Sequence, residues 1–349
     1  MKSTQLLLLS GICLAATFFT LSCDNRISSS SDSTTEIESI EKKSNTSHAP
    51  GGTASCKSAG DTGQTALYVN QSVKNATINF TNHDCDIAIY FDENAPENAM
   101  VQNTTIIQET GNSGEKTGIW NQGGNVTVHH SAFSTDFAGQ YIPIRFEDGA
   151  RGMVSMNKVT GNHRVAIVVR GALTEVTIKG NTIAGSGPKK GDWAENGIQV
   201  DGEATAAIIN NDISGHWWDG DSNFASSAVS MLGASNSRVT NNTFQNNEVS
   251  IVLFGTGNKV TGNSTSSQIV SQSEFDFKAY GAWIGGSDNH LAGNTFSSPP
   301  GTGAVGIYIF PGSPNARVTG NHVHGFTTAI FDGTGDAMIK GTPTPLQGI

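Results

Sequence analysis

Hydrophobic and polar residues alternate with a period of two near the middle of the chain, in Asn196–Gly202. Apolar Ile198 and Val200 alternate there with Gly197, Gln199 and Asp201, the pattern of a β-strand with one buried face. Similar heptads recur about 20 to 30 residues apart, a spacing typical of a solenoid. The heptads are Ile87–Glu93, Thr117–Gly123, Ile142–Asp148, Val165–Gly171, Asn196–Gly202, Ser227–Gly233, Val249–Gly255, Tyr280–Gly286, Val305–Pro311 and Thr328–Thr334.

Aligning the heptads produces two columns that we expect to face a core. The central column reads Ile89, Ile119, Ile144, Ile167, Ile198, Val229, Ile251, Ala282, Ile307 and Ile330. The second reads Phe91, Asn121, Phe146, Val169, Val200, Met231, Leu253, Ile284, Ile309 and Asp332. Because one coil cannot bury this side alone, neighbouring coils must stack. The polar residue that ends the second column indicates that the stack ends there.

A second phrase, apolar-x-x-Asn-x-apolar, recurs between the heptads. Its asparagines are Asn157, Asn181, Asn211, Asn242, Asn263, Asn294 and Asn321, and the earlier coils place Thr104 and Ser131 at this position. Stacked asparagines at a bend can bond to one another and satisfy the backbone groups of the turn. This column therefore predicts architecture, not a site.

These two phrases resemble the repeats of the right-handed parallel β-helix proteins of the pectate-lyase-like fold, over roughly residues 75–336. The resemblance implies an all-β chain, a right-handed parallel β-helix (solenoid) of about ten rungs, within a domain of residues 56–336. Members of that fold act on acidic polysaccharides, serve as adhesins or have no assigned role. The resemblance therefore predicts the fold and leaves the activity open.

The amino end has the features of an export signal. Residues 1–22 carry Lys2, a short apolar run and a small residue before Cys23, which is typical of a signal peptide. Thr20–Cys23 resembles the bacterial lipobox, which implies lipidation of Cys23 and an outer-membrane or cell-surface lipoprotein; plain secretion or a periplasmic location is the alternative. Residues 23–55 are rich in Ser and Thr and predict a disordered tether, and residues 337–349 form a tail.

Cysteine content and charge narrow the interpretation further. In an oxidising compartment Cys56 and Cys85 would pair and fix the amino-terminal segment to the first rung; two separate buried thiols are the alternative. No Cys/His spacing resembles a zinc site. A net charge of -10 without a basic stripe disfavours nucleic acid as a partner, and membrane contact is expected only through the lipid. The oligomeric state is not indicated.

Three further heptad columns are expected to face outward. The first is small throughout, from Ala88, Gly118 and Pro143 to Gly306 and Ala329, and would form a floor for a flat ligand. The next two carry aromatic rings towards both ends and polar groups in the middle. Candidate sugar-binding residues on this face are Tyr90, Trp120, Gln199, Trp283 and Tyr308. Two long insertions beside it add Lys190, His216, Trp217 and Trp218, although a tryptophan in such a loop more often only packs it.

The middle of this face carries a charged cluster, Arg145, Glu147, Arg170 and Asp201, together with Gln199. One interpretation is a cross-strand ladder of ion pairs. The other is a catalytic site. In the latter case Glu147 and Asp201 would hold Ca²⁺ against a substrate carboxylate while Arg170 or Lys190 helps to remove a proton, as the resemblance to pectate lyases implies. Alternatively the two carboxylates, about 9.6 Å apart at the backbone, would act as an inverting hydrolase pair.

The polygalacturonase motifs and the pectate lyase signature segments are absent from the sequence. The leading hypothesis is therefore a surface protein whose heptad face binds, and cleaves if the cluster is catalytic, an extracellular acidic polysaccharide. The alternative is a non-catalytic adhesion or structural protein. In either case the tail would cover part of the face if it lay along Trp283, Tyr308 and Phe331.

Overall fold

The computed structural model describes residues 55–109, 114–136, 139–187, 194–218, 225–267, 279–300 and 303–342. Within these ranges the chain forms short β-strands and two 3₁₀ turns, η1 (Gly60–Thr62) and η2 (Phe80–Asn82), and no α-helix. None of the described segments is a helix long and apolar enough to cross a membrane. The expected signal peptide, Cys23 and all but the last residue of the expected tether lie outside the described residues.

The strands build three sheets, two of them wholly parallel. The heptad sheet consists of β1 (Lys57–Ser58), β2 (Thr65–Val69), β5 (Ile87–Phe91), β8 (Glu115–Gln122), β11 (Gln140–Glu147), β14 (Val165–Arg170), β17 (Asn196–Asp201), β20 (Ser227–Leu232), β23 (Val249–Leu253), β26 (Tyr280–Ile284), β29 (Gly303–Ile309) and β32 (Phe326–Asp332); only β1 is antiparallel to its neighbour. The eleven-stranded sheet consists of β3 (Val73–Lys74), β6 (Ala99–Gln102), β9 (Asn125–His129), β12 (Arg151–Ser155), β15 (Glu175–Lys179), β18 (Thr205–Ile209), β21 (Arg238–Thr240), β24 (Lys259–Thr261), β27 (His290–Ala292), β30 (Arg317–Thr319) and β33 (Met338–Lys340). The ten-stranded sheet consists of β4 (Thr77–Asn79), β7 (Thr105–Gln108), β10 (Ala132–Thr135), β13 (Lys158–Gly161), β16 (Thr182–Ala184), β19 (Asp212–Ser214), β22 (Thr243–Gln245), β25 (Ser264–Ser266), β28 (Thr295–Ser297) and β31 (His322–His324).

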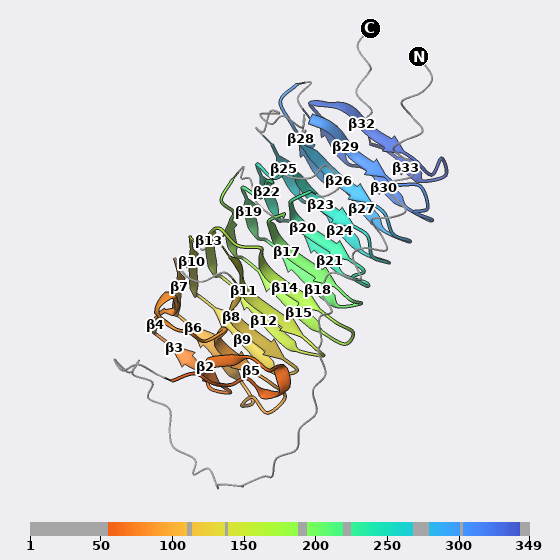
Figure 1. Ribbon diagram of the computed structural model, residues 1–349. Helices are drawn as coiled ribbons and strands as arrows, with labels where there is room; N and C mark the ends of the chain where they lie inside the picture. The colour runs from red at the N-terminus through yellow and green to blue at the C-terminus, as the bar shows by residue number, and fades with distance from the viewer. Residues whose placement is uncertain are drawn as a thin grey trace. The chain divides into compact units, whose positions relative to one another are not determined.

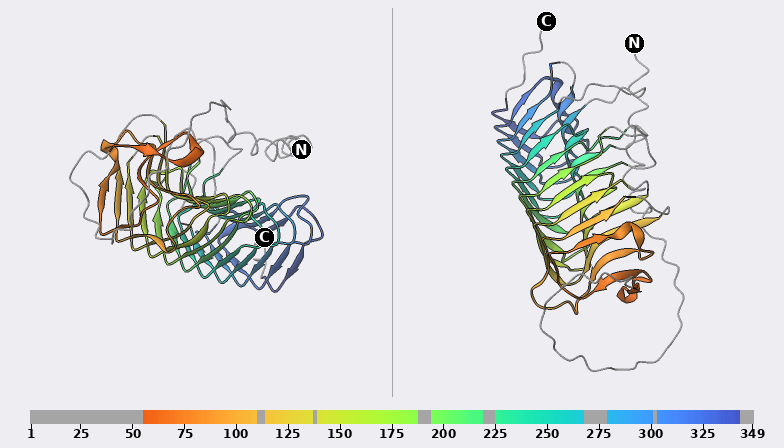
Figure 2. Two further views of the ribbon diagram at one scale, coloured as in Figure 1. Left: turned by 90° about the horizontal axis from the view of Figure 1, so that it is seen from below. Right: turned by 90° about the vertical axis from the view of Figure 1, so that its left-hand side faces the viewer.

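Each coil contributes one strand to each sheet, in the same order every time. In Figure 1 the strands of a sheet lie side by side in chain order, from orange at β2 to blue at β32. Figure 2 shows the same succession of coils from two other directions. Every predicted heptad forms a strand of the heptad sheet, and the central column pairs in register from Ile89 with Ile119 to Ile307 with Ile330. The predicted parallel solenoid is confirmed.

The interior is a continuous apolar core. Both inward columns are buried over most of their length, and the core continues through the apolar positions of the other two sheets, such as Ile178, Ile208 and Ile213. At the bend between the eleven-stranded and ten-stranded sheets the asparagine column is present as predicted. Asn211 Oδ1, for example, accepts hydrogen bonds from the backbone N and Nδ2 of Asn181, both at 2.9 Å.

The column of small residues differs from the expectation, because it faces the core and not solvent. Ala88, Ala166 and Ala228 are fully buried core residues. A Cβ at Gly197 would lie 2.7 Å from Cγ2 of Ile213, a side chain of the ten-stranded sheet. The small residue of each strand is not paired with its counterpart on the next strand, whereas the residues on either side of it are. The strand bends at this position, so the small residue and the central apolar residue that follows it both point inward. The column is small because the opposite wall is close, and it offers no floor to a ligand.

The two ends of the solenoid are closed differently. At the first coils a disulfide joins Cys56 to Cys85, which confirms the predicted pairing. At the other end Asp332 accepts hydrogen bonds from the backbone of Thr334 and Gly335 and so closes the turn after the last heptad strand. Sheet structure continues past the expected limit at residue 336, since β33 pairs with β30. This part of the expected tail extends the eleven-stranded sheet, and residues 343–349 lie outside the described residues.

Candidate functional site

The charged cluster on the heptad sheet forms a chain of ion pairs that crosses four strands. Arg145 on β11 contacts Glu115 of β8 at 2.9 Å and Glu147 of its own strand at 2.8 Å. Arg170 on β14 lies 3.6 Å from Glu147 and 2.8 Å from Asp201 of β17. Opposite charges on neighbouring strands therefore alternate along the sheet, and this alternation stabilises a parallel arrangement.

The cluster is also largely shielded from water. Only 7% of the Glu147 side chain is exposed, against 32% for Arg170. The guanidinium of Arg145 covers the ring of Trp120, with the carbon 4.2 Å from the ring centroid. Arg145 Nε and Glu147 Oε1 are close but not aligned as a hydrogen bond, so their attraction is electrostatic. Because each carboxylate of the cluster contacts an arginine, the ion-pair ladder describes this geometry better than an open acid–base pair does.

Gln199 belongs to the same network. Its Nε2 donates a hydrogen bond of 2.7 Å to Asp201 Oδ2, which also receives Nη2 of Arg170 at 3.1 Å. The described residues contain no group of three or more His, Cys, Asp or Glu side chains arranged to hold a metal. Calcium binding by Glu147 and Asp201 therefore stays a prediction from the sequence.

The aromatic residues at the amino-terminal end are buried, so Tyr90 and Trp120 are not the sugar-binding surface that the sequence suggested. Tyr90 is 2% exposed and Trp120 7%; their rings pack edge to face on each other and form a buried cluster with Ala59 and Ala66. The Tyr90 hydroxyl donates to Gln122 Oε1 at 3.0 Å. Burial, and then the negative charges of Asp92 and Glu93, raise the pKa of Tyr90 to about 12.

The insertion after β19 is likewise buried where the structure describes it. His216 is inaccessible to solvent; its Nδ1 lies 3.0 Å from Asn247 Oδ1 and its Nε2 lies 3.1 Å from Nε2 of His163. Trp217 and Trp218 are 4% and 6% exposed. The expectation that these three side chains contact a sugar is therefore wrong, because they pack the insertion onto the solenoid. Lys190, on the preceding insertion, lies outside the described residues.

The aromatic residues at the carboxy-terminal end do form a surface, which we call the aromatic face. It comprises Phe254, Tyr280, Trp283, Tyr308, Phe310 and Phe331. Trp283, Tyr308 and Phe331 occupy one column on β26, β29 and β32. The rings of Tyr308 and Phe331 are stacked at 25° with centroids 4.6 Å apart, and Phe331 is 42% exposed.

The remaining rings of the aromatic face fill the gaps between that column and the strand ends. Phe310 meets Tyr308 at 4.5 Å and Trp283 at 5.8 Å between centroids, and Phe254 packs on Phe310 edge to face. Burial raises the pKa of Tyr308, and burial followed by the charge of Glu248 raises that of Tyr280, so both phenols stay neutral hydrogen-bonding groups near neutral pH. Phe331 belongs to the face expected from the sequence, and Phe310 is added to it by the structure.

A match to a family model supports the architecture. The family model described as "Right handed beta helix region" matches residues 143–267. The chain is a right-handed parallel β-helix. Among solved structures it resembles the A-module of the mannuronan C-5 epimerase AlgE6 of Azotobacter vinelandii, at 15% sequence identity and a TM-score of 0.40, over 79% of this chain and 75% of that one. A resemblance at this level says nothing about the activity of this β-helix. No curated protein sequence matches it.

Proposed function

We propose that this β-helix is an exported protein that binds an extracellular polysaccharide, with the aromatic face as the surface that receives sugar rings. The observation that supports the proposal is the in-register column Trp283, Tyr308 and Phe331, which presents rings on successive strands. Neighbouring strands lie about 4.8 Å apart, so the column offers a regular series of aromatic rings to a linear chain.

The chemistry of these side chains suits a sugar. A pyranose ring has an apolar face of C–H groups that packs on an aromatic ring, and its hydroxyls need hydrogen-bond partners at the edge. Tyr280 and Tyr308 supply phenolic hydroxyls beside the apolar rings. Exposure of Phe331 at the end of the column costs free energy in water, which a bound partner would recover.

The arrangement of the charged cluster favours binding without cleavage. An acid–base mechanism needs one carboxyl group that can take up or release a proton beside the substrate. Glu147 and Asp201 are both engaged in ion pairs with arginines, and only 7% of the Glu147 side chain is exposed, so neither carboxylate lies open beside a substrate. In this proposal the cluster stabilises the middle of the heptad sheet, and the aromatic face makes the contact with the ligand.

The test is retardation of the full chain in gels that contain neutral or acidic polysaccharides. We expect at least one polysaccharide to retard the wild type, and Tyr308→Ala/Phe331→Ala to weaken that binding about tenfold, since two stacking contacts are lost. Met156→Ala, which removes a residue that is 57% exposed on a distant turn, is the matched control and should bind as the wild type does. Absence of retardation with every polysaccharide, or equal binding by the double variant and the control, would contradict the proposal.

A further inference from the structure

A column of basic residues crosses the outer face of the eleven-stranded sheet. Arg238 on β21, Lys259 on β24, His290 on β27 and Arg317 on β30 pair with one another in register on successive strands. Arg238, Lys259 and Arg317 are exposed and His290 is half-buried. We call these four residues the basic column. No function described above uses it.

The basic column is unfavourable for the folded chain by itself. Like charges that lie directly opposite on neighbouring strands, about 4.8 Å apart, repel one another. Within the described residues, none of the ion pairs recorded for this protein involves Arg238, Lys259 or Arg317. The positive charge of the column is also opposite in sign to the net charge of the whole chain, which is -10. An arrangement of like charges that has no ion pair within the described residues is stabilised when an anion binds.

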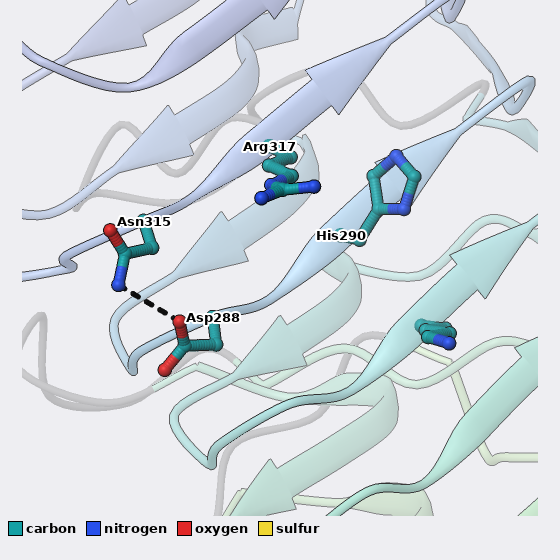
Figure 3. Close-up of a pocket in the computed structure, with 5 residues that line it drawn as sticks. Asp288, His290, Asn315 and Arg317 are labelled. Atoms are coloured by element: carbon teal, nitrogen blue, oxygen red, sulfur yellow. Dashed lines mark hydrogen bonds between the residues drawn. The ribbon is translucent and has the colours of Figure 1, made fainter.

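A shallow pocket lies at the carboxy-terminal half of this column. Its volume is about 220 Å³, and Lys259, Asp288, His290, Asn315 and Arg317 line it. Figure 3 shows His290 and Arg317 on adjacent strands, with Asp288 and Asn315 at the turns beside them. The Asn315 amide donates a hydrogen bond of 2.9 Å to Asp288, which holds that carboxylate at the rim. The pocket therefore combines cationic groups with a polar edge.

The neighbouring positions indicate what kind of anion fits. The next outward column on the same strands holds Thr240, Thr261, Ala292 and Thr319. Its hydroxyls can bond to a sugar, whereas it carries no aromatic ring on which a nucleic-acid base would stack. A single file of cations on an otherwise acidic protein also suits a narrow linear chain better than a broad charged surface such as a membrane.

We propose that the basic column binds a linear acidic polysaccharide that runs across the strands, with its carboxylate or sulfate groups at Arg238, Lys259 and Arg317. This inference rests on the proposed function, because it assigns a negative charge to the same class of ligand. It concerns a different face, since the aromatic face lies on the heptad sheet and the column lies on β21, β24, β27 and β30 of the eleven-stranded sheet.

The experiment compares two charge-matched double variants of the full chain. Lys259→Ala/Arg317→Ala removes two cations of the column, and Lys158→Ala/Lys179→Ala removes two exposed lysines elsewhere on the solenoid. Binding is measured with a polyuronate, a sulfated polysaccharide and a neutral polysaccharide at several salt concentrations. We expect the first variant to bind the acidic chains about tenfold more weakly than the control, with a shallower salt dependence, and to bind the neutral chain equally.

The outcomes separate the two proposals. Equal binding of both acidic chains by the two variants, no binding of either acidic chain by the wild type, or tighter binding of single-stranded nucleic acid would each overturn the basic column as a polysaccharide site. Loss of acidic binding in Lys259→Ala/Arg317→Ala together with unchanged binding in Tyr308→Ala/Phe331→Ala would support the column and contradict the aromatic face. A carboxylate ligand is distinguished from a sulfate ligand by which acidic chain the wild type prefers.

Discussion

Arg170 holds Asp201 by two hydrogen bonds across neighbouring strands: Nε donates to Oδ1 at 2.8 Å and Nη2 donates to Oδ2 at 3.1 Å. Such a two-point contact fixes both side chains. Because Asp201 also accepts from Gln199, the middle of the heptad sheet is a closed polar network.

The first prediction concerns this pair. In a double-mutant cycle of Arg170→Ala and Asp201→Ala, the two side chains should show a coupling free energy of about 1 kcal/mol, since Arg170 is partly exposed and its charge is screened. Urea denaturation measures it. Polysaccharide binding should be unchanged in both single variants. A negligible coupling accompanied by lost binding would indicate that the pair belongs to a ligand site.

A second prediction concerns the asparagine column. Asn211→Ala removes the acceptor of two buried donors, the backbone N and Nδ2 of Asn181. Leaving them unsatisfied should lower the free energy of unfolding by about 2 to 4 kcal/mol. Asp212→Ala, at the exposed neighbouring position, is the control and should change it by about 0.5 kcal/mol or less. Similar denaturation midpoints for the two variants would show that the column does not stabilise the fold.

The disulfide gives a third prediction. Replacing Cys56 and Cys85 by alanine opens a link across 29 residues and should lower the free energy of unfolding by about 3 kcal/mol. Hydrogen exchange should increase first in β1 and β2, because Ala59, which follows β1, and Ala66 of β2 pack in one cluster with Tyr90 and Trp120. Uniform exchange along all coils would instead mean that the bond has no local effect on the first coils.

The fourth prediction is a pH dependence at the basic column. Burial, and then the charges of Arg317 and Lys259, hold the pKa of His290 below its ordinary value of 6.5. Thr319 lies 3.0 Å from Nε2 of His290, and Asp288 is the acidic group of the pocket. A bound polyanion would favour the imidazolium, so His290 takes up a proton on binding, and affinity increases as the pH falls.

The measurement is the affinity for a sulfated polysaccharide, whose own charge stays constant, between about pH 7 and pH 5. The wild type should bind more tightly at the lower pH, and His290→Gln should lose most of this change. The same pH dependence in both proteins would exclude His290 as the group that titrates.

The sequence was sufficient to predict the solenoid because its signals are repeated. Isoleucine at the centre of nearly every heptad defines the register, and asparagine at the same bend defines the coil. Strict alternation predicts that the small column faces outward, whereas the strand bends at that position and turns the column inward. Gly197 and Gly281 show why the column must be small, because each faces a bulky side chain of the opposite wall of the solenoid.

The functional surface was harder to predict, because exposure depends on what covers each ring. Tyr90 and Trp217 are no different in kind from Tyr308 and Trp283, yet the first two are buried by neighbouring segments. The basic column can be recognised in the sequence. Each of Arg238, Lys259, His290 and Arg317 directly precedes the first apolar residue of the asparagine phrase, so the repeat that predicts the architecture also aligns these four residues.

The most direct test of the account is hydroxyl-radical footprinting of the full chain with and without a polysaccharide that retards it. The account predicts that the ligand protects Trp283, Tyr308 and Phe331 from oxidation and leaves Met156 unchanged. Protection confined to other parts of the β-helix, or no protection at the aromatic face at saturating ligand, would contradict it.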